Sequence, residues 1–250
     1  MSRTHRNVVA PLLTGVLLAT AVLKTSDAHV IIDGEIAQPI LLDIARYLRE
    51  TKGGMTEEAR VEALYLLGEK AQGLVELMNM DLMAHGKSLY AELLVKRLRE
   101  YGIWITFVER NRRYVYDLAA LQEYLKRLPR GKWAADAGFR LIGESFYRSI
   151  GTDAAELLDL DLDGLRKAVL QKEAFLKEYP AYEKVKEVRF FLAIDYYRLY
   201  KNSPDPATAR KYEKLSVQAL QDIVKEYPGT AEARAAEITL EKLQGAGQKK

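Results

Sequence analysis

Apolar residues recur at helical spacing along most of the chain. The pattern is clear between Glu35 and Glu50, where Ile36, Ile40 and Ile44 stand four places apart. This spacing is typical of a helix with one buried face. The same criterion predicts helices over Glu35–Glu50, Glu57–Met83, Lys87–Tyr101, Lys132–Ser149, Gly164–Tyr179, Tyr182–Tyr200, Ala207–Tyr227 and Thr230–Leu243. A further helix is expected to be capped by Asp117 and to run to Leu128.

Start and stop signals agree with these helices. Thr56 is followed by two glutamates, which favours a helix start, and Gly86 is expected to end the helix that begins there. Asp163 and Asp205 are predicted N-caps, because an aspartate side chain accepts hydrogen bonds from the free N–H groups of the first turn. Pro206 then takes the first helical position, where its missing N–H is tolerated.

Residues 103–116 change to a pattern typical of strands. The run I-W-I-T-F-V is followed by the polar run E-R-N-R-R and then by Y-V-Y. β-Branched and aromatic residues on both sides of a polar turn predict a β-hairpin. A lone hairpin is only marginally stable in water, so one of its faces is expected to lie on the helices.

Three segments in the second half of the chain end alike. Y-L-K-R-L-P ends at Pro129, F-L-K-E-Y-P at Pro180 and I-V-K-E-Y-P at Pro228, so the prolines are 51 and 48 positions apart. Small or apolar residues follow at five and eight places after each proline, and large apolar residues at ten and twelve. These positions hold Ala134, Ala137, Phe139 and Leu141; Val185, Val188, Phe190 and Leu192; and Ala233, Ala236, Ile238 and Leu240.

Recurrence at this scale is typical of stacked helical repeats, in which each unit buries its apolar face against its neighbours. The sequence therefore predicts a mainly all-α protein, built as a solenoid of helical hairpins, with a small β-hairpin insertion near residues 103–116. The expected organisation is a signal peptide (1–28), an amino-terminal helical region with the β-hairpin (29–117), the helical repeats (118–244) and a disordered tail (245–250).

The first 28 residues have the features of an export signal. Arg3 and Arg6 give a basic start, residues 8–23 carry no charge, and Ser26 and Ala28 are small residues at the −3 and −1 positions of a cleavage site. The uncharged run is shorter than the roughly 20 residues of a spanning helix. We expect cleavage after Ala28, with an uncleaved membrane anchor as the alternative.

Composition narrows the class of protein further. Loss of residues 1–28 removes three basic residues and one acidic residue, which lowers the formal net charge from +3 to +1. A near-neutral chain lacks the basic surface expected of a nucleic-acid-binding protein. There are no cysteines, which excludes disulfides, thiolate chemistry and lipidation of a cysteine. An exported chain without disulfides is expected in the bacterial periplasm.

The segment from Tyr124 to Tyr147 carries a resemblance. A helix ending in x-P, a short turn and small residues lead to Ile142, Gly143 and Phe146, which match the L/I-G-x-x-F/Y signature. This resembles a tetratricopeptide-repeat (TPR) junction, of the variety found in BamD-like outer-membrane assembly proteins and in YbgF-like proteins of the Tol system. Leu67 and Gly68 form a further short match.

The resemblance implies pairs of helices that stack into a curved array and bind a polypeptide on its concave face. The first helix of each pair would line that face. Polar and aromatic residues that lie off the packing positions are the candidates for contact, since arginine and tyrosine are enriched at protein interfaces. These candidates are Arg140, Tyr147, Arg189, Tyr196 and Arg198.

Two features could bind a metal ion. Asp159, Asp161 and Asp163 occupy positions 1, 3 and 5 of a calcium-loop pattern, but Leu170 stands at position 12 where a bidentate glutamate is needed. His29 would become the amino terminus after cleavage, and an amino-terminal histidine can chelate copper. His85 stands alone beside Gly86 and is expected to be a loop residue.

The leading expectation is a non-enzymatic periplasmic scaffold that binds a protein or peptide of the cell envelope. It needs no cofactor, binds no nucleic acid and has no membrane anchor after signal cleavage. The alternative is an envelope metal-binding protein or enzyme that uses His29 or the acidic turn at 159–163. The identity of the partner and the oligomeric state are left open by the sequence.

Overall fold

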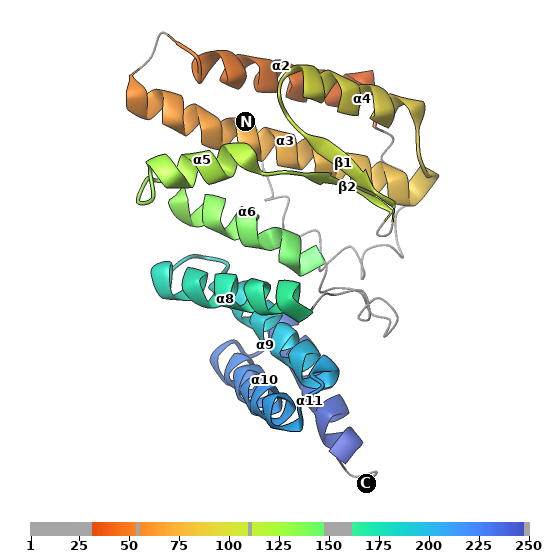
Figure 1. Cartoon of the computed structure of the whole chain (residues 1–250), viewed down its shortest axis with the longest axis vertical. Coiled ribbons are helices and arrows are strands. Elements are labelled where there is room, and N and C mark those ends of the chain that lie inside the picture. The colour runs from red at the N-terminus through yellow and green to blue at the C-terminus, as the bar shows by residue number, and fades with distance from the viewer. Residues whose placement is uncertain (1–31, 54–55, 110–111, 148–161, 248–250) are drawn as a thin grey trace, which may run out of the picture.

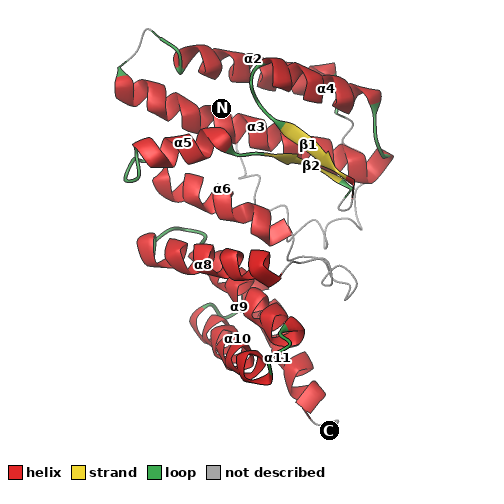
Figure 2. Cartoon of the chain, viewed as in Figure 1, coloured by secondary structure: helices red, strands yellow, loops and turns green. Residues whose placement is uncertain are grey.

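The computed structural model describes residues 32–53, 56–109, 112–147 and 162–247 (Figure 1). Within them the chain forms nine helices and one two-stranded antiparallel sheet (Figure 2). The helices are α2 (Gly34–Glu50), α3 (Glu57–His85), α4 (Leu89–Glu100), α5 (Ala119–Arg127), α6 (Ala134–Tyr147), α8 (Leu162–Glu178), α9 (Val185–Asn202), α10 (Pro206–Glu226) and α11 (Ala231–Gly247). The expected mainly helical protein with one β-hairpin is confirmed.

The helices form one elongated stack, with α2 and α4 at one end and α10 and α11 at the other (Figure 1). From α5 onward each helix packs on the next helix in the chain, and α9 also touches α11. At the amino-terminal end α3 is central, because α2, α5 and β2 all pack against it. This position explains why the apolar residues of α3 are not confined to one stripe.

Most of the predicted helix boundaries are confirmed by the caps. The Thr56 hydroxyl accepts the N–H of Ala59 at 3.3 Å, and Asp205 accepts N–H groups of the first turn of α10. Gly86 ends α3 with a φ of +80°, a conformation that glycine adopts without strain. Several helix starts differ by two or three residues, as at α9, which begins at Val185 rather than at Tyr182. Two further differences concern a cap and a helix end. Helix α8 begins at Leu162, so Asp163 lies inside its first turn and is not its cap.

The second difference is at the carboxyl end. Helix α11 continues to Gly247, so the helix does not end before the tail predicted to begin at residue 245. Gly245 and Gly247 are therefore accommodated within the last turns. Glycine lowers helix propensity by about 1 kcal/mol relative to alanine, which is small enough for the preceding helix to override.

The β-hairpin is shorter than the predicted segment, because its first strand begins at residue 105 and not at residue 103. Strand β1 (Ile105–Val108) pairs with β2 (Arg113–Tyr116), and Ile105 stands opposite Tyr116. Ile105, Tyr114 and Tyr116 are buried on the face that covers the helices. On α3, the Asn79 amide accepts the N–H of Tyr114 at 2.7 Å and donates to its C=O at 2.9 Å, which holds the outer edge of β2.

The apolar core is divided at α6. One cluster is built by α2, α3, α4, α5 and the hairpin, and it reaches α6 through Ala137 and Leu141. A second cluster begins with Phe139 and Ile142 of α6 and continues to α11. A smaller third cluster lies along α8 and α9. Because α6 contributes to both large clusters, it is the helix that joins the amino-terminal region to the rest of the stack.

The three proline-terminated segments fold alike. In each of them the residue before the proline donates its N–H to the carbonyl four residues earlier, and its own carbonyl accepts the N–H three residues later. The first bond joins Leu128 to Tyr124 (2.8 Å), Tyr179 to Phe175 (2.8 Å) and Tyr227 to Ile223 (3.0 Å). The second joins Gly131 to Leu128 (3.0 Å), Tyr182 to Tyr179 (3.2 Å) and Thr230 to Tyr227 (3.3 Å).

The packing positions also recur. The residues five and eight places after each proline are at most 7% exposed in all three copies: Ala134, Ala137, Val185, Val188, Ala233 and Ala236. At ten places Phe139 and Phe190 are 4% and 8% exposed, whereas Ile238 is 55% exposed. Ile238 lies on α11, the last described helix of the stack, so no further helix of the described chain covers it.

Candidate functional site

The five candidate binding residues lie on α6 and α9, but in different environments. The Arg189 side chain on α9 is 40% exposed and forms an ion pair with Glu226 at the end of α10. The Arg140 side chain is only 14% exposed and is held by Asp136 and Glu69. Tyr147 is the last residue of α6, and its side chain is outside the described part of the structure.

Tyr196 and Arg198 are buried, which corrects their assignment to an exposed face. Tyr196 is 7% exposed and donates its hydroxyl proton to Glu173 of α8, with an O–O distance of 2.5 Å. Arg198 is 2% exposed and forms an ion pair with Asp195 at 3.6 Å. Each side chain has an acidic partner inside the stack: Glu173 of α8 for Tyr196, and Asp195 of the same helix for Arg198.

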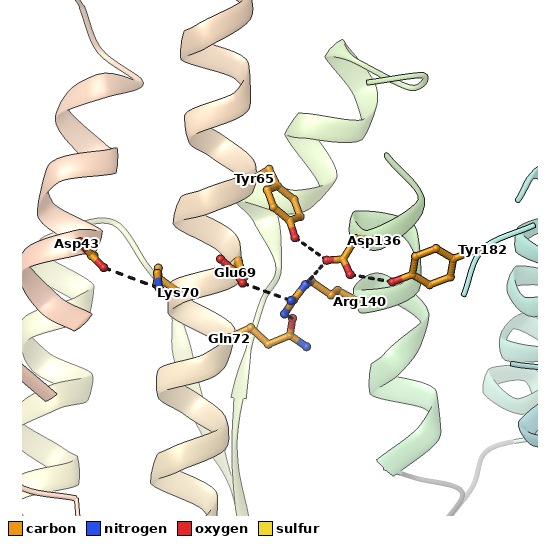
Figure 3. A network of polar contacts seen from close by, with 8 residues as sticks. All are labelled: Asp43, Tyr65, Glu69, Lys70, Gln72, Asp136, Arg140 and Tyr182. Atoms are coloured by element: carbon orange, nitrogen blue, oxygen red, sulfur yellow. Dashed lines mark hydrogen bonds and ion pairs between the residues drawn. The ribbon is translucent and has the colours of Figure 1, made fainter. Parts of the chain in front are cut away.

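A network of polar side chains crosses the junction between the amino-terminal region and the repeats (Figure 3). Its centre is the carboxylate of Asp136 on α6. One oxygen accepts the hydroxyl proton of Tyr65 on α3 at 2.6 Å and the Nε–H of Arg140 at 2.5 Å. The other accepts the hydroxyl proton of Tyr182, from the turn between α8 and α9, at 2.8 Å. Three separate elements therefore meet at one carboxylate.

Helical spacing places the partners of this network on matching faces. Tyr65, Glu69 and Gln72 are four and three places apart on α3, so they lie on one side of that helix. Arg140 follows Asp136 by one turn and also reaches Glu69, at 3.6 Å. The ring of Trp133 stacks on Tyr65, with centroids 4.9 Å apart and ring planes inclined by 5°. Two stacked aromatic rings therefore border the network on the side of Tyr65.

The electrostatics of the network favour one protonation state. Burial alone would raise the pKa of Asp136, but the charge of Arg140 and the hydrogen bonds from Tyr65, Arg140 and Tyr182 outweigh burial and lower it. Burial, followed by the hydrogen bond to Asp136, raises the pKa of Tyr65, and burial together with the negative charge of Asp136 raises the pKa of Tyr182. Near neutral pH the carboxylate is ionised and both phenols are protonated.

This arrangement holds protons in place rather than transferring them. A general base or acid is most effective when its pKa lies near the working pH, and the shifts at Asp136, Tyr65 and Tyr182 all lead away from neutrality. The geometry is that of a clamp that fixes α3, α6 and the turn before α9 relative to one another. We call these residues the Asp136 clamp.

A second charged cluster lies inside the repeats. Lys172 of α8 donates to Asp195 of α9 at 2.6 Å, and both side chains are at most 1% exposed. Burial lowers the pKa of Lys172, and the negative charge of Asp195 opposes this effect. Arg198 contacts the other oxygen of the same carboxylate. A carboxylate between two buried cations stabilises the contact of α8 with α9 but presents no group to solvent.

The predicted metal-binding features fall mostly outside the described residues. His29, Asp159 and Asp161 belong to segments that the structure does not describe. Asp163 forms a hydrogen-bonded ion pair with Arg166 at 3.0 Å. His85 is the last residue of α3 rather than a loop residue, and its Nδ1 is 3.0 Å from Asp81. Within the described ranges no group of three or more His, Cys, Asp or Glu side chains is placed to hold a metal ion.

A groove between α2 and α4 is the feature that sequence reasoning missed. It has a volume of about 450 Å³ and is lined by Gln38, Leu41, Leu42, Tyr90, Leu93, Leu94, Lys96, Arg97, Glu100 and Tyr101. The available signal was the excess of leucines on the short helix α4, in which Leu94 and Leu98 face the core while Leu89 and Leu93 do not. An amphipathic helix needs only one apolar stripe, and α4 has a second.

None of the helices in the described part of the chain combines the length and the apolar character needed to cross a bilayer. Comparison of the sequence with protein-family models gives no match, and comparison with curated proteins and with solved structures gives no significant match either.

Proposed function

We propose that this protein is a non-enzymatic scaffold of the bacterial cell envelope, in which TPR-like helix pairs stack into a short solenoid and hold another protein. The observation that carries the proposal is the recurrence of one turn geometry at Pro129, Pro180 and Pro228, with the same packing positions buried after each proline. Arrays of units that contact only their neighbours present a long continuous surface and are used mainly for binding polypeptides.

In this proposal α6 with α8 and α9 with α10 are the complete pairs, and α11 is the first helix of a third. The TPR resemblance assigns the binding face to the first helix of each pair. Arg189 of α9 is the exposed candidate on that face. Arg140 is mostly buried and is held by Asp136 and Glu69. Tyr196 is buried and joins α9 to α8 through Glu173 and to α10 through the ring of Tyr212, while Arg198 is buried beside Asp195.

The cellular location in this proposal depends on the sequence alone. Residues 1–28 carry the basic start, the uncharged run and the small residues of an export signal. Sequencing of the amino terminus of the protein recovered from the periplasmic fraction is expected to begin at His29. A chain that retains Met1 and stays with the cytoplasmic fraction would exclude an envelope scaffold.

The binding function is tested by covalent cross-linking in intact cells, followed by purification of the tagged full chain and mass spectrometry. We expect a small set of envelope proteins that depends on Arg189. These proteins should no longer be recovered with the Arg189→Glu variant. They should still be recovered with Arg210→Glu, which reverses the charge of an exposed residue on α10. An unchanged set in Arg189→Glu would move the binding surface away from α9, and recovery of no envelope protein would contradict the scaffold function.

A further inference from the structure

The groove between α2 and α4 lies at the end of the molecule opposite α11 (Figure 1). Leu41 and Leu94 are buried at its base, at 9% and 3% exposure. Leu42 and Leu93, from the two opposing helices, are 61% and 62% exposed. Two leucines of this exposure on the walls of one groove form an apolar surface that the described chain does not cover.

Helix α4 is built to pack on two sides. Only Ala91, Leu94 and Leu98 of its 12 residues are buried, and they face the core. Leu89 and Leu93 are 80% and 62% exposed and stand one turn apart on another face. A helix with a single neighbour needs one apolar stripe, so the second stripe of α4 has no counterpart in the described chain.

The groove has the shape to accept a helix. Its lining residues on α4 span Tyr90 to Tyr101, which corresponds to a length of about 17 Å at 1.5 Å per residue. Gly34 at the start of α2 lies beside Tyr90, since a Cβ placed on Gly34 would be 3.9 Å from the Tyr90 hydroxyl. The two helices therefore flank the groove side by side, and a third helix can rest between them with its side chains interleaved.

The charges at the groove are mostly positive. Lys96 and Arg97 line it together with one acidic residue, Glu100. Among the described residues Arg97 contacts the Tyr101 hydroxyl at 3.3 Å, and no described carboxylate forms an ion pair with either cation. A second copy of this chain seated through the same groove would bring these cations against each other, because a two-fold interface repeats its own surface. An acidic ligand is favoured instead.

We infer that the groove between α2 and α4 is the docking site for an amphipathic α-helix of a partner protein, with apolar side chains that contact Leu42 and Leu93 and acidic side chains that face Lys96 and Arg97. The inference extends the proposed scaffold function by naming a surface and the kind of partner it fits. Glu100 would oppose anionic headgroups, which disfavours a lipid surface as the occupant.

The test uses a synthetic helical peptide of about 14 residues, roughly four turns. It carries leucines on one face, glutamates beside them and alanine elsewhere, and its binding to the full chain is measured by fluorescence anisotropy. We expect saturable binding that weakens at least about tenfold in Leu93→Glu and in Leu42→Glu. A peptide of the same composition with its leucines scattered around the helix should bind more weakly.

Leu170 on α8 provides a matched control, because it is 63% exposed and lies far along the chain from the groove. Leu170→Glu should leave peptide affinity unchanged within about twofold, a range that surface substitutions away from the site rarely exceed. Absence of saturable binding, or an equal loss in Leu170→Glu and Leu93→Glu, would overturn the inference. Circular dichroism of each variant checks that the helices are retained.

Charge specificity has its own variant. The double variant Lys96→Glu/Arg97→Glu should bind the glutamate peptide more weakly than the wild-type chain does. It should bind a peptide in which lysine replaces glutamate more tightly. If both peptides change alike, the acidic part of the inference is wrong. Binding to vesicles with anionic lipids that is lost in Leu93→Glu, without peptide binding, would assign the groove to a membrane. Self-association that is lost in Leu93→Glu would assign it to a second copy.

The cellular cross-linking experiment separates this inference from the scaffold function. If the same envelope proteins are recovered with the wild-type chain and with the Leu42→Glu and Leu93→Glu variants, the groove inference fails and the scaffold function stands. If no envelope protein is recovered with any chain, the scaffold function fails, whatever the synthetic peptide does. Where a partner is recovered, a photo-reactive residue at position 93 should cross-link to an acidic helical segment of that partner. The same residue placed at position 170 should not.

Discussion

Gly68 of α3 lies directly against Leu121 of α5. A Cβ placed on Gly68 would be 2.7 Å from Cγ and Cδ2 of Leu121 and 3.3 Å from its backbone nitrogen, and Leu121 is fully buried. The two helices can approach this closely only because residue 68 has no side chain. Gly68 is therefore a packing residue between α3 and α5.

Gly68→Ala is expected to destabilise the protein by about 1–3 kcal/mol, because the added methyl group overpacks the contact with Leu121. Gly73→Ala, five residues later on α3, meets no atom within 4 Å. It should stabilise the protein by up to about 1 kcal/mol through helix propensity. Urea denaturation of both variants tests whether their stabilities change in opposite directions. A stabilising Gly68→Ala would show that α3 and α5 do not pack as described.

Sequence patterns predict the helices and the hairpin because these depend on local chemistry. Spacing of apolar residues, caps such as Thr56 and Asp205, and the φ preference of Gly86 act within one or two turns of the chain. The residue before each proline is held outside the helical region by the proline ring, which ends the preceding helix. The recurrence at Pro129, Pro180 and Pro228 is therefore visible before any contact between helices is known.

The candidate binding residues were harder to predict because exposure depends on partners distant in the chain. Arg198 and Tyr196 look like surface residues, yet both are buried inside the stack. Arg198 forms an ion pair with Asp195 at 3.6 Å, and Glu173 of α8 accepts the hydroxyl proton of Tyr196. Tyr65 and Asp136 are 71 positions apart in sequence and 2.6 Å apart in space. Pairings of this kind follow from the order in which helices stack, which no single-helix pattern contains.

The Asp136 clamp predicts a specific dependence of stability on pH. Asp136 has a pKa below its ordinary value of 3.8 in the folded protein. Its contribution to stability is therefore complete above about pH 4–5 and is lost as pH falls through the lowered value. Asp136→Asn should lower the free energy of unfolding by about 1.5–3 kcal/mol at pH 7, since hydrogen bonds to a charged group are lost.

The informative quantity in this experiment is the difference in the free energy of unfolding between wild type and Asp136→Asn. It should be constant from about pH 8 to pH 5 and should shrink below about pH 4, as the wild-type carboxylate takes up a proton. Tyr65→Phe and Tyr182→Phe should each remove part of the same contribution, because each deletes one donor to Asp136. A difference that does not vary with pH would show that Asp136 is not ionised in the clamp.

The repeat register predicts unequal effects at equivalent positions. Phe190 and Ile238 both stand ten places after a repeat proline, but they are 8% and 55% exposed. Phe190→Ala should cost about 3–5 kcal/mol through the cavity that it leaves. Ile238→Ala should change stability by less than about 0.5 kcal/mol. Thermal denaturation tests both, and a large loss in Ile238→Ala would mean that another helix covers the end of the stack.

For the buried pair of Lys172 and Asp195, we expect the second substitution to recover part of the stability that the first one removes. Asp195→Leu should cost about 3–5 kcal/mol, because it leaves Lys172 and Arg198 as buried cations without this carboxylate. Lys172→Met in addition removes one of those cations and replaces it with an apolar side chain of similar length. The double variant should therefore be more stable than Asp195→Leu alone, by about 1–3 kcal/mol. Denaturant titration of the two variants and of Lys172→Met completes the cycle. Additive losses would show that the two side chains do not interact across α8 and α9.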